Sequence, residues 1–166
     1  PAAVALAANG ALCAVIALPL IPAGALAATP VPAINEVARE SVGWPEFTAA
    51  VRRVLDGLPP EDRARAIVLT GSYGEHGALA RAGVPRVYSG HNQLHAYGPP
   101  PETGTVAVAV NIGPRAMAFQ YGGCEEKARV TNAAGVDNEL RGMPVFLCRG
   151  LNQPWSVAWP RYLHYS

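Results

Sequence analysis

The hydrophobic pattern divides the chain at about residue 28. Residues 1–28 contain no charged side chain, and Asn9 is the only strongly polar residue among them. The run lacks the polar stripe that a surface helix of a globular protein shows. About 20 consecutive apolar residues are enough to cross the hydrocarbon core of a bilayer as a helix. The sequence therefore predicts a transmembrane helix over residues 1–28, which Pro19 and Pro22 end or kink near the interface.

A cleavable signal peptide is the alternative interpretation of this apolar run. Ala25-Leu26-Ala27 has the small-x-small pattern of a cleavage site. Against this alternative, the chain starts at Pro1 without a Met and has no basic region before the apolar residues. We therefore favour a membrane span, and we expect it to be the last span of a larger protein.

Beyond residue 28 the pattern predicts a linker followed by alternating helices and strands. Residues 29–44 contain two prolines and are expected to form an extended linker. From Pro45 the apolar residues recur at helical spacing, which predicts a helix that stops at Gly57. Shorter helices are predicted at about 75–81 and 114–121. Apolar runs with strand character occupy residues 66–70, 86–89, 105–112, 127–131 and 145–149.

Strands that alternate with helices predict βαβ units, a mostly parallel sheet and helices on both of its faces. The expected fold class is therefore α/β, a small Rossmann-like domain of three layers over residues 45–166. A preceding transmembrane helix completes the expected architecture.

Charge and cysteine content narrow the function and the compartment. The formal net charge is +1, with acidic and basic residues interspersed. A nucleic-acid surface or a polybasic membrane patch needs clustered positive charge, so neither is expected. Cys13 lies in the apolar run, which leaves Cys124 and Cys148 as a possible disulfide or as two ordinary buried thiols.

Two polar loops follow the first two predicted strands, at residues 70–75 and 89–100. In open parallel sheets, ligands bind beyond the carboxyl ends of the strands. The glycines of the first loop permit tight turns, and the helix after it presents free backbone donors. We therefore predict a substrate-binding cleft lined by five polar or aromatic residues, Tyr73, Glu75, His91, Asn92 and Tyr97.

Each of these residues also has an ordinary structural interpretation. Glu75 in a first helical turn favours the helix dipole. Asn92 can cap a turn, and Tyr97 can belong to a rigid loop with the Gly and Pro residues that come after it. Both interpretations stay open, although the shared position of the two loops at one sheet edge favours binding.

A serine hydrolase is a sharper alternative. Residues 70–74 resemble a nucleophile elbow, in which a strained turn between strand and helix exposes a serine. Ser72 would be the nucleophile, His91 or His164 the base and Asp137 the orienting acid. The usual first glycine of that motif is replaced by a threonine, and the domain is short for that hydrolase fold. Since a motif needs its whole constellation, this function is the least favoured one.

Metal binding by His76, His91 and His95 is a second sharper alternative. Histidines four residues apart face the same way only on a helix, and Gly90 and Gly98 argue against a long helix there. We therefore assign no metal, no cofactor and no catalytic residue to this chain.

Several short segments resemble a known family when they are taken in order along the chain. They are Gly43-Trp44-Pro45, residues 69–75, residues 88–92, residues 97–100, Cys148-Arg149-Gly150 and residues 155–165. In this order they resemble the C-terminal extracytoplasmic domain of bacterial, especially actinobacterial, glycosyltransferase family 39 proteins. These proteins are relatives of the protein mannosyltransferases and have the GT-C architecture. The chain departs from the family pattern at Ser72, where Asn is frequent, and at His76, where Ala is frequent.

The resemblance implies a function. Such a parent protein is a membrane enzyme that transfers a sugar from a polyprenyl-phosphate donor to an acceptor outside the cytoplasm. Its catalytic carboxylate lies between early membrane helices that this chain lacks, so the chain alone is expected to be inactive and to assist acceptor binding. The implied partners are the lipid bilayer, the donor and the acceptor, and the implied location favours a Cys124–Cys148 disulfide. The alternative is a membrane-tethered module that binds a carbohydrate or cell-wall component without catalysis.

Overall fold

The computed structural model describes residues 2–18 and 20–165 of the chain, and these form two compact units. Unit 1 comprises Pro1–Glu46 with Thr131–Gly142. Unit 2 comprises Phe47–Val130 with Met143–Ser166. The chain therefore leaves unit 1, enters unit 2, and returns to unit 1 for one short segment.

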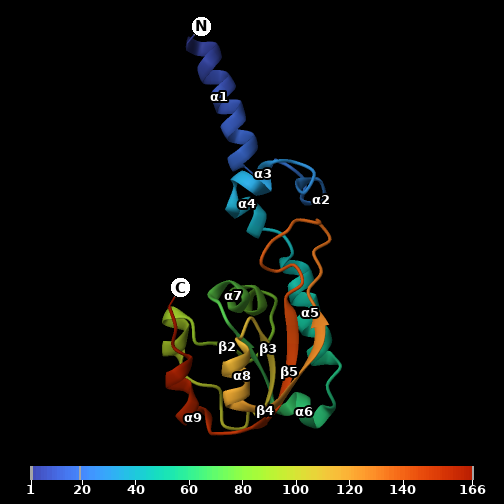
Figure 1. Cartoon of the computed structure of the whole chain (residues 1–166), viewed down its shortest axis with the longest axis vertical. Helices are drawn as coiled ribbons and strands as arrows, with labels where there is room; N and C mark the ends of the chain where they lie inside the picture. Colours follow the sequence, from blue (N-terminus) through green and yellow to red (C-terminus); the bar gives the residue numbers. More distant parts are fainter. Residues whose placement is uncertain (1, 19, 166) are drawn as a thin grey trace. The chain divides into compact units, whose positions relative to one another are not determined.

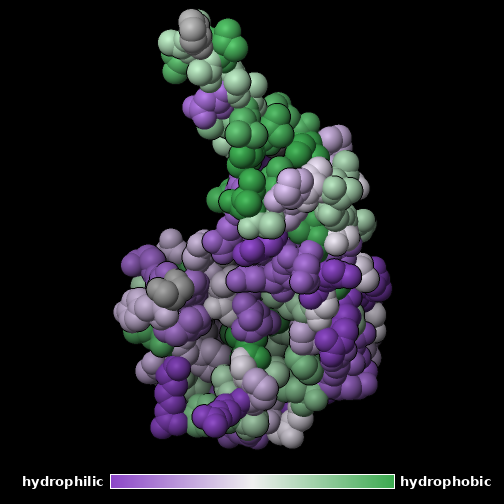
Figure 2. All heavy atoms as spheres, turned by 45° about the horizontal axis from the view of Figure 1, so that its top comes forward, coloured by the Kyte–Doolittle hydropathy of each residue, from purple (hydrophilic) through white to green (hydrophobic). Residues whose placement is uncertain are grey.

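Unit 1 is built from short helices around a small apolar core. Its helices are α1 (Ala2–Ala17), α2 (Ala23–Leu26), α3 (Val31–Ile34) and α4 (Glu36–Glu40). None of the residues of α1 is buried, and Figure 2 shows apolar side chains gathered over this helix and the short helices after it. Leu26, Val31 and Val136 form the core of the unit.

The transmembrane helix predicted over residues 1–28 is not present as one helix. Helix α1 has 16 residues, and Pro22 stands at the start of the separate helix α2 with an extended backbone (ψ 139°). Within residues 2–18 and 20–165, no helix combines the length and apolar character needed to cross a membrane. Pro1 and Pro19, which also belong to the predicted span, lie outside the described residues.

The extended linker predicted over residues 29–44 is also corrected, because this segment contains α3 and α4. Proline is tolerated in the first turn of a helix, and Pro32 occupies that position in α3. Asn35 caps α4 by accepting a hydrogen bond from the backbone of Ala38 (3.0 Å), and its amide donates to the carbonyl of Ile16 (2.6 Å). The two prolines therefore start a helix instead of extending the chain.

Unit 2 contains the sheet (Figure 1). Its strands are β1 (Ala66–Thr70), β2 (Val87–Ser89), β3 (Val106–Val110), β4 (Tyr121–Arg129) and β5 (Pro144–Leu151). Its helices are α5 (Trp44–Asp56, which begins in unit 1), α6 (Pro60–Arg65), α7 (Tyr73–Arg81), η1 (Asn92–Tyr97), α8 (Pro114–Gln120), α9 (Trp155–Ala158) and η2 (Trp159–Tyr162). The predicted α/β class is confirmed at this level.

The sheet is mixed, with the strand order β2-β1-β3-β5-β4. Strand β1 pairs in parallel with β2 and β3, whereas β5 is antiparallel to both β3 and β4. The prediction of a mostly parallel sheet is therefore wrong, since parallel pairing is confined to β1, β2 and β3. Parallel neighbours need a crossover connection, usually a helix, whereas antiparallel neighbours do not. No helix separates β4 from β5 in the part of the chain that the structure describes.

The central strands β1 and β3 are buried along their whole length, which requires cover on both faces of the sheet. Ile67 pairs with Ala107 and Leu69 with Ala109, so these four side chains share one face. They belong to one core with the aromatic and aliphatic residues of α8, α9 and η2, including Trp155. The alternate valines of both strands are equally buried on the other face.

Cys124 of β4 and Cys148 of β5 are directly opposite each other and form a disulfide. Cys148 is fully buried, whereas Cys124 is exposed. Cys13 is a free and exposed thiol. Of the two interpretations left open by the sequence, the structure therefore contains the disulfide.

Candidate functional site

The carboxyl ends of the three parallel strands lie at one edge of the sheet. Thr70 at the end of β1 is in register with Ser89 at the end of β2 and with Val110 at the end of β3. The loops after these strands therefore start side by side. This is the edge at which open parallel sheets bind ligands.

Two glycines allow the loops at this edge to approach closely. A Cβ atom on Gly71 would collide with the backbone of Asn111, and a Cβ atom on Gly90 would collide with the backbone of Tyr162. Asn111 itself has a positive φ of 52°, which asparagine tolerates better than most residues. The loops after β1 and β3, and the loop after β2 with the C-terminal segment, are therefore in direct backbone contact.

Glu75 is buried and joins two of these loops. Its Oε2 accepts a hydrogen bond from the backbone N–H of Ser72 (2.6 Å), and Ser72 Oγ accepts one from the backbone N–H of Glu75 (3.5 Å). This reciprocal pair is a capping box at the start of α7. The Asn111 side-chain amide donates to the other carboxylate oxygen (2.7 Å). Because both oxygens have donors, Glu75 organises the edge and is not available as a free base.

His91 lies in a stack of three rings at the centre of the edge. Its ring is stacked against Tyr73 (centroids 5.1 Å apart) on one side and His164 (5.0 Å) on the other. Its Nδ1 accepts a hydrogen bond from the backbone N–H of Tyr73 (3.0 Å), so in the neutral ring Nε2 carries the proton. Nε2 is buried and has no hydrogen-bond partner within residues 2–18 and 20–165. A buried donor of this kind is costly unless a ligand or a water accepts from it.

His164 is held from both ends of its ring. Its Nε2 lies 2.7 Å from the carbonyl oxygen of Gly71, and its Nδ1 lies 2.8 Å from the carbonyl oxygen of Tyr162. The C-terminal segment is also fixed by its backbone, since Asn92 donates to the carbonyl of His164 (2.9 Å).

The structure thus brings together three of the five predicted site residues, Tyr73, Glu75 and His91. Asn92 joins them through its backbone, at the start of η1 and with a φ of 49°. Tyr97 lies at the far end of η1, is 80% exposed, and has no place in the described ring stack. The side chains that meet at this edge form one group, the edge cluster: Ser72, Tyr73, Glu75, His91, Asn111 and His164.

Ser72, Asn111 and His164 are the cluster members that were not assigned to substrate binding from the sequence, and Ser72 and His164 were considered only for the hydrolase. Asn111 comes directly after β3, so the rule that selected the first two loops also selects it. His164 lies close to the chain end and reaches the cluster through a bridge with His91. No local pattern marks that long-range pairing.

The geometry does not support the hydrolase or the metal site. Ser72 Oγ caps α7. Nδ1 of His91 and both ring nitrogens of His164 have backbone groups as partners, and none of them contacts the Ser72 hydroxyl. His95 is stacked on Trp159 with ring centroids 5.0 Å apart. Among the described residues, no group of three or more His, Cys, Asp and Glu side chains is arranged to hold a metal ion.

A hollow of about 490 Å³, the edge hollow, adjoins the edge cluster and shares residues with it. It is lined by side chains from the loop after β3, from α8 and from the C-terminal segment, including Asn111, Arg115, Phe119, Arg161, Tyr162 and His164. The Tyr162 hydroxyl is buried without a described partner, and burial raises its pKa to about 12. Tyr162 therefore stays neutral at physiological pH, and the charged side chains that line the edge hollow are Arg115 and Arg161.

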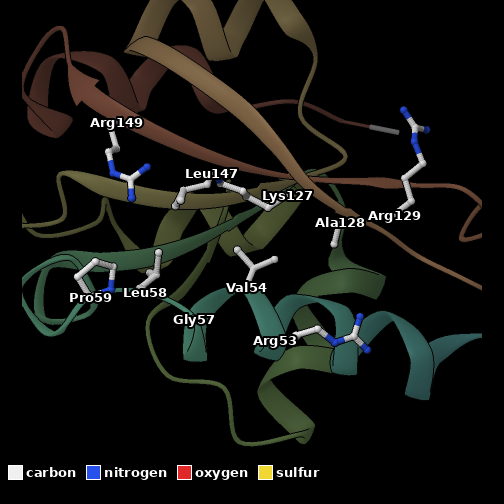
Figure 3. A pocket seen from close by; sticks show the side chains of 10 residues that line it. All are labelled: Arg53, Val54, Gly57, Leu58, Pro59, Lys127, Ala128, Arg129, Leu147 and Arg149. Atoms are coloured by element: carbon white, nitrogen blue, oxygen red, sulfur yellow. The ribbon is translucent and has the colours of Figure 1, made fainter.

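A second hollow, of about 480 Å³, lies between α5 and the β4–β5 pair and is called the basic groove. Its cationic residues are Arg53, Lys127, Arg129 and Arg149. Figure 3 shows their side chains spread around the apolar side chains of Val54, Leu58 and Leu147 without converging on one point.

Three of the four cations in the basic groove already have acidic partners. The ion pairs are Lys127–Glu125 (2.7 Å), Arg129–Glu126 (2.7 Å) and Arg149–Asp62 (2.8 Å). The hydrogen bond from Arg149 holds the pKa of the Asp62 carboxyl below its ordinary value. The edge hollow is therefore the better candidate for a ligand.

Comparison of this chain with known protein families, with curated proteins and with solved structures finds no match. The description of this protein therefore rests on its own architecture. It is a small mixed α/β unit, attached to a helical unit, with a polar cluster at the carboxyl edge of its parallel strands.

Proposed function

We propose that unit 2 is the ligand-binding module of an integral-membrane glycosyltransferase and holds the acceptor at the edge cluster. One observation carries this proposal. The two loops with the most distinctive glycosyltransferase-like residues, 69–75 and 88–92, meet through the bond from the Tyr73 backbone to His91 and through the stacking of their rings. Segments that are separate in the sequence thus form one cluster at the edge where Rossmann-like sheets bind ligands.

The chemistry of the cluster favours binding over catalysis. Glu75 and Ser72 are engaged in capping α7, so neither is free to act as a base or a nucleophile. Tyr73 is 65% exposed and presents an aromatic ring with a hydroxyl tip, a surface suited to contact with a sugar. His91 Nε2 is a buried ring nitrogen that has no partner among the described residues. Transfer of the sugar from a polyprenyl-phosphate donor is then assigned to the membrane part of the enzyme.

Two further features support a position at the outer face of a membrane. Helix α1 carries exposed apolar side chains such as Val4 (73%) and Leu6 (72%), which lipid would cover. The disulfide fits an oxidising compartment outside the cytoplasm. We therefore propose that unit 1 contacts the bilayer and that unit 2 lies on the extracytoplasmic side.

The proposal is tested with paired tyrosine variants of the intact membrane protein. Tyr73→Ala removes an exposed ring of the edge cluster, and Tyr97→Ala removes a still more exposed ring outside it. We expect Tyr73→Ala to raise the KM for the acceptor about tenfold with little change in kcat, the effect of losing one good contact. Tyr97→Ala should leave both constants unchanged.

The readout is transfer of labelled sugar from a polyprenyl-phosphate donor in membranes, at varied acceptor concentration. Wild-type kinetics in Tyr73→Ala would refute acceptor binding at this edge. If the intact protein binds glycans at the edge but transfers no sugar, the second candidate function holds, a membrane-tethered binding module without catalysis. That candidate is favoured by the structural engagement of Ser72 and Glu75.

A further inference from the structure

The arginines of unit 2 differ in whether they have a partner. Arg65 and Arg149 are paired with Asp62, Arg129 with Glu126, and Arg86 donates to backbone carbonyls. Arg115 and Arg161 belong to the arginines that have no ion pair or hydrogen bond within the part of the chain that the structure describes. Both line the edge hollow.

The fold holds these two guanidinium groups at the same hollow. Arg115 and Phe119 are four residues apart on α8, so their side chains lie on one face of that helix. The Arg161 guanidinium, from η2, lies 4.7 Å from the centre of the Phe119 ring. This cation–π contact positions Arg161 without neutralising its charge. One helix face and one stacked arginine therefore define a positively charged wall.

Two other polar side chains of the edge cluster, His164 and Glu75, are already engaged by neighbouring groups. The two ring nitrogens of His164 lie 2.7 Å from the carbonyl oxygen of Gly71 and 2.8 Å from that of Tyr162. The nearest acid of the edge cluster, Glu75, is buried and has donors on both oxygens. Both of its oxygens are therefore already occupied by the donors of Ser72 and Asn111.

We infer that the edge hollow binds an oxyanion, a phosphate or a carboxylate, that is carried by the sugar acceptor. This inference rests on the proposed function and names the chemical class of the acceptor. Guanidinium groups bind carboxylate and phosphate oxygens through paired, charge-assisted hydrogen bonds, which makes them the fitting donors for such a group. Ile112 and Ala116 line the hollow beside the arginines and supply an apolar surface for the body of the ligand. The acceptor is thus a negatively charged glycan.

The inference is tested by titrating the full 166-residue chain, in nonionic detergent at low salt, with three small sugars. The probes are glucose 1-phosphate, glucuronate and the neutral methyl glucoside. Binding is followed by calorimetry and by the backbone amide resonances of residues 111–119 and 161–164. The variant is Arg115→Gln with Arg161→Gln. The control is Arg81→Gln, which removes one charge from the other end of α7.

At least one anionic probe should shift the resonances of the hollow, and its Kd should rise about tenfold or more in the double variant, with no change in Arg81→Gln. The probe that binds more tightly identifies the anion as a phosphate or a carboxylate. Equal affinity for methyl glucoside and the anionic sugars would overturn the anionic class while leaving sugar binding intact. Unchanged affinity in the double variant would overturn the site. Absence of binding by all three probes would contradict both this inference and acceptor binding by the module.

Discussion

The edge hollow and the basic groove have similar volumes and both contain arginines, but they differ in whether these cations have acidic partners. In the basic groove, acids neutralise three of the four cations, and the Arg149–Asp62 pair ties β5 to α6. At the edge hollow, Arg115 and Arg161 have no ion pair among the described residues, and the nearby Glu75 is occupied by its own donors. The number of cations in a hollow is thus a poor guide to ligand binding. What matters is whether the fold has already satisfied them.

Among the variants that test this difference between the two hollows, Glu75→Ala is expected to have the largest effect on stability. This change removes the capping box and leaves the Ser72 N–H and the Asn111 amide without their buried acceptor. The free energy of unfolding should fall by about 2–3 kcal/mol, the cost of stranding buried donors together with the loss of a cap. Urea unfolding of the full chain measures it.

Glu61→Ala is the matched control for that prediction. Glu61 also lies in the first turn of a helix, α6, but it is exposed and belongs to no capping box. The stability should therefore change little. An equal loss in both variants would mean that Glu75 acts only through the helix dipole, and the edge cluster would lose its organising residue.

A smaller effect is expected in the basic groove from Asp62→Asn. The Arg149 hydrogen bond lowers the pKa of Asp62 below its ordinary value of 3.8, so this group stabilises the folded state above that pH. The contribution is lost as the pH falls through the folded-state pKa. Asp62→Asn should lower the melting temperature at neutral pH and flatten its decline below about pH 4.

Asp56→Asn is the control for the groove, because the Asp56 side chain is exposed and outside the described ion pairs. Melting curves between neutral and acidic pH compare the two variants. Identical curves for Asp62→Asn and the wild type would show that the Arg149–Asp62 pair contributes nothing, and the contrast between the two hollows would then lie in their ligands alone.

The smallest effect is expected at His76, on the helix that starts in the edge cluster. Burial lowers the pKa of His76 below 6.5, and a backbone hydrogen bond at Val87 only partly opposes this. The unfolded chain therefore binds a proton more readily, and stability falls as the pH drops through about 6.5. His76→Gln should show a shallower fall in melting temperature between about pH 7.5 and 5. A steeper fall would contradict the direction of the shift.

The parts of the fold that the sequence predicted well are those whose signal is local. Strand β1 has the predicted bounds, Ala66–Thr70, because a strand buried on both faces reads as one continuous apolar run. Strand β4 begins at Tyr121, six residues before the predicted start. Its first half contains Gly122, Gly123 and exposed charged residues, so no hydrophobic pattern in the sequence predicts this part of the strand.

Two of the missed helices share one cause. Helix α6 begins at Pro60, and α3 has proline in its first turn, where the missing N–H is not needed. In the sequence alone, these prolines indicate stops or extended positions equally well. The antiparallel β4–β5 pairing was missed for another reason, since strand direction depends on contacts between distant segments.

The candidate site was predictable in part for the same reason. Tyr73 and His91 come after strands whose ends meet, and the rule for parallel sheets was sufficient to place them together. Tyr97 was included because its loop looked unusually polar, but η1 carries it away from the ring stack. His164 required knowledge of its pairing with His91. The glycosyltransferase resemblance stays a prediction.

The disulfide has a topological consequence. Cys124 and Cys148 close a covalent ring, and the segment Thr131–Gly142 that belongs to unit 1 is contained within that ring. A single proteolytic cut anywhere between the two cysteines therefore opens the ring without releasing either piece. Under oxidising conditions a nicked chain keeps its full mass, and it separates into two fragments only when the disulfide is reduced.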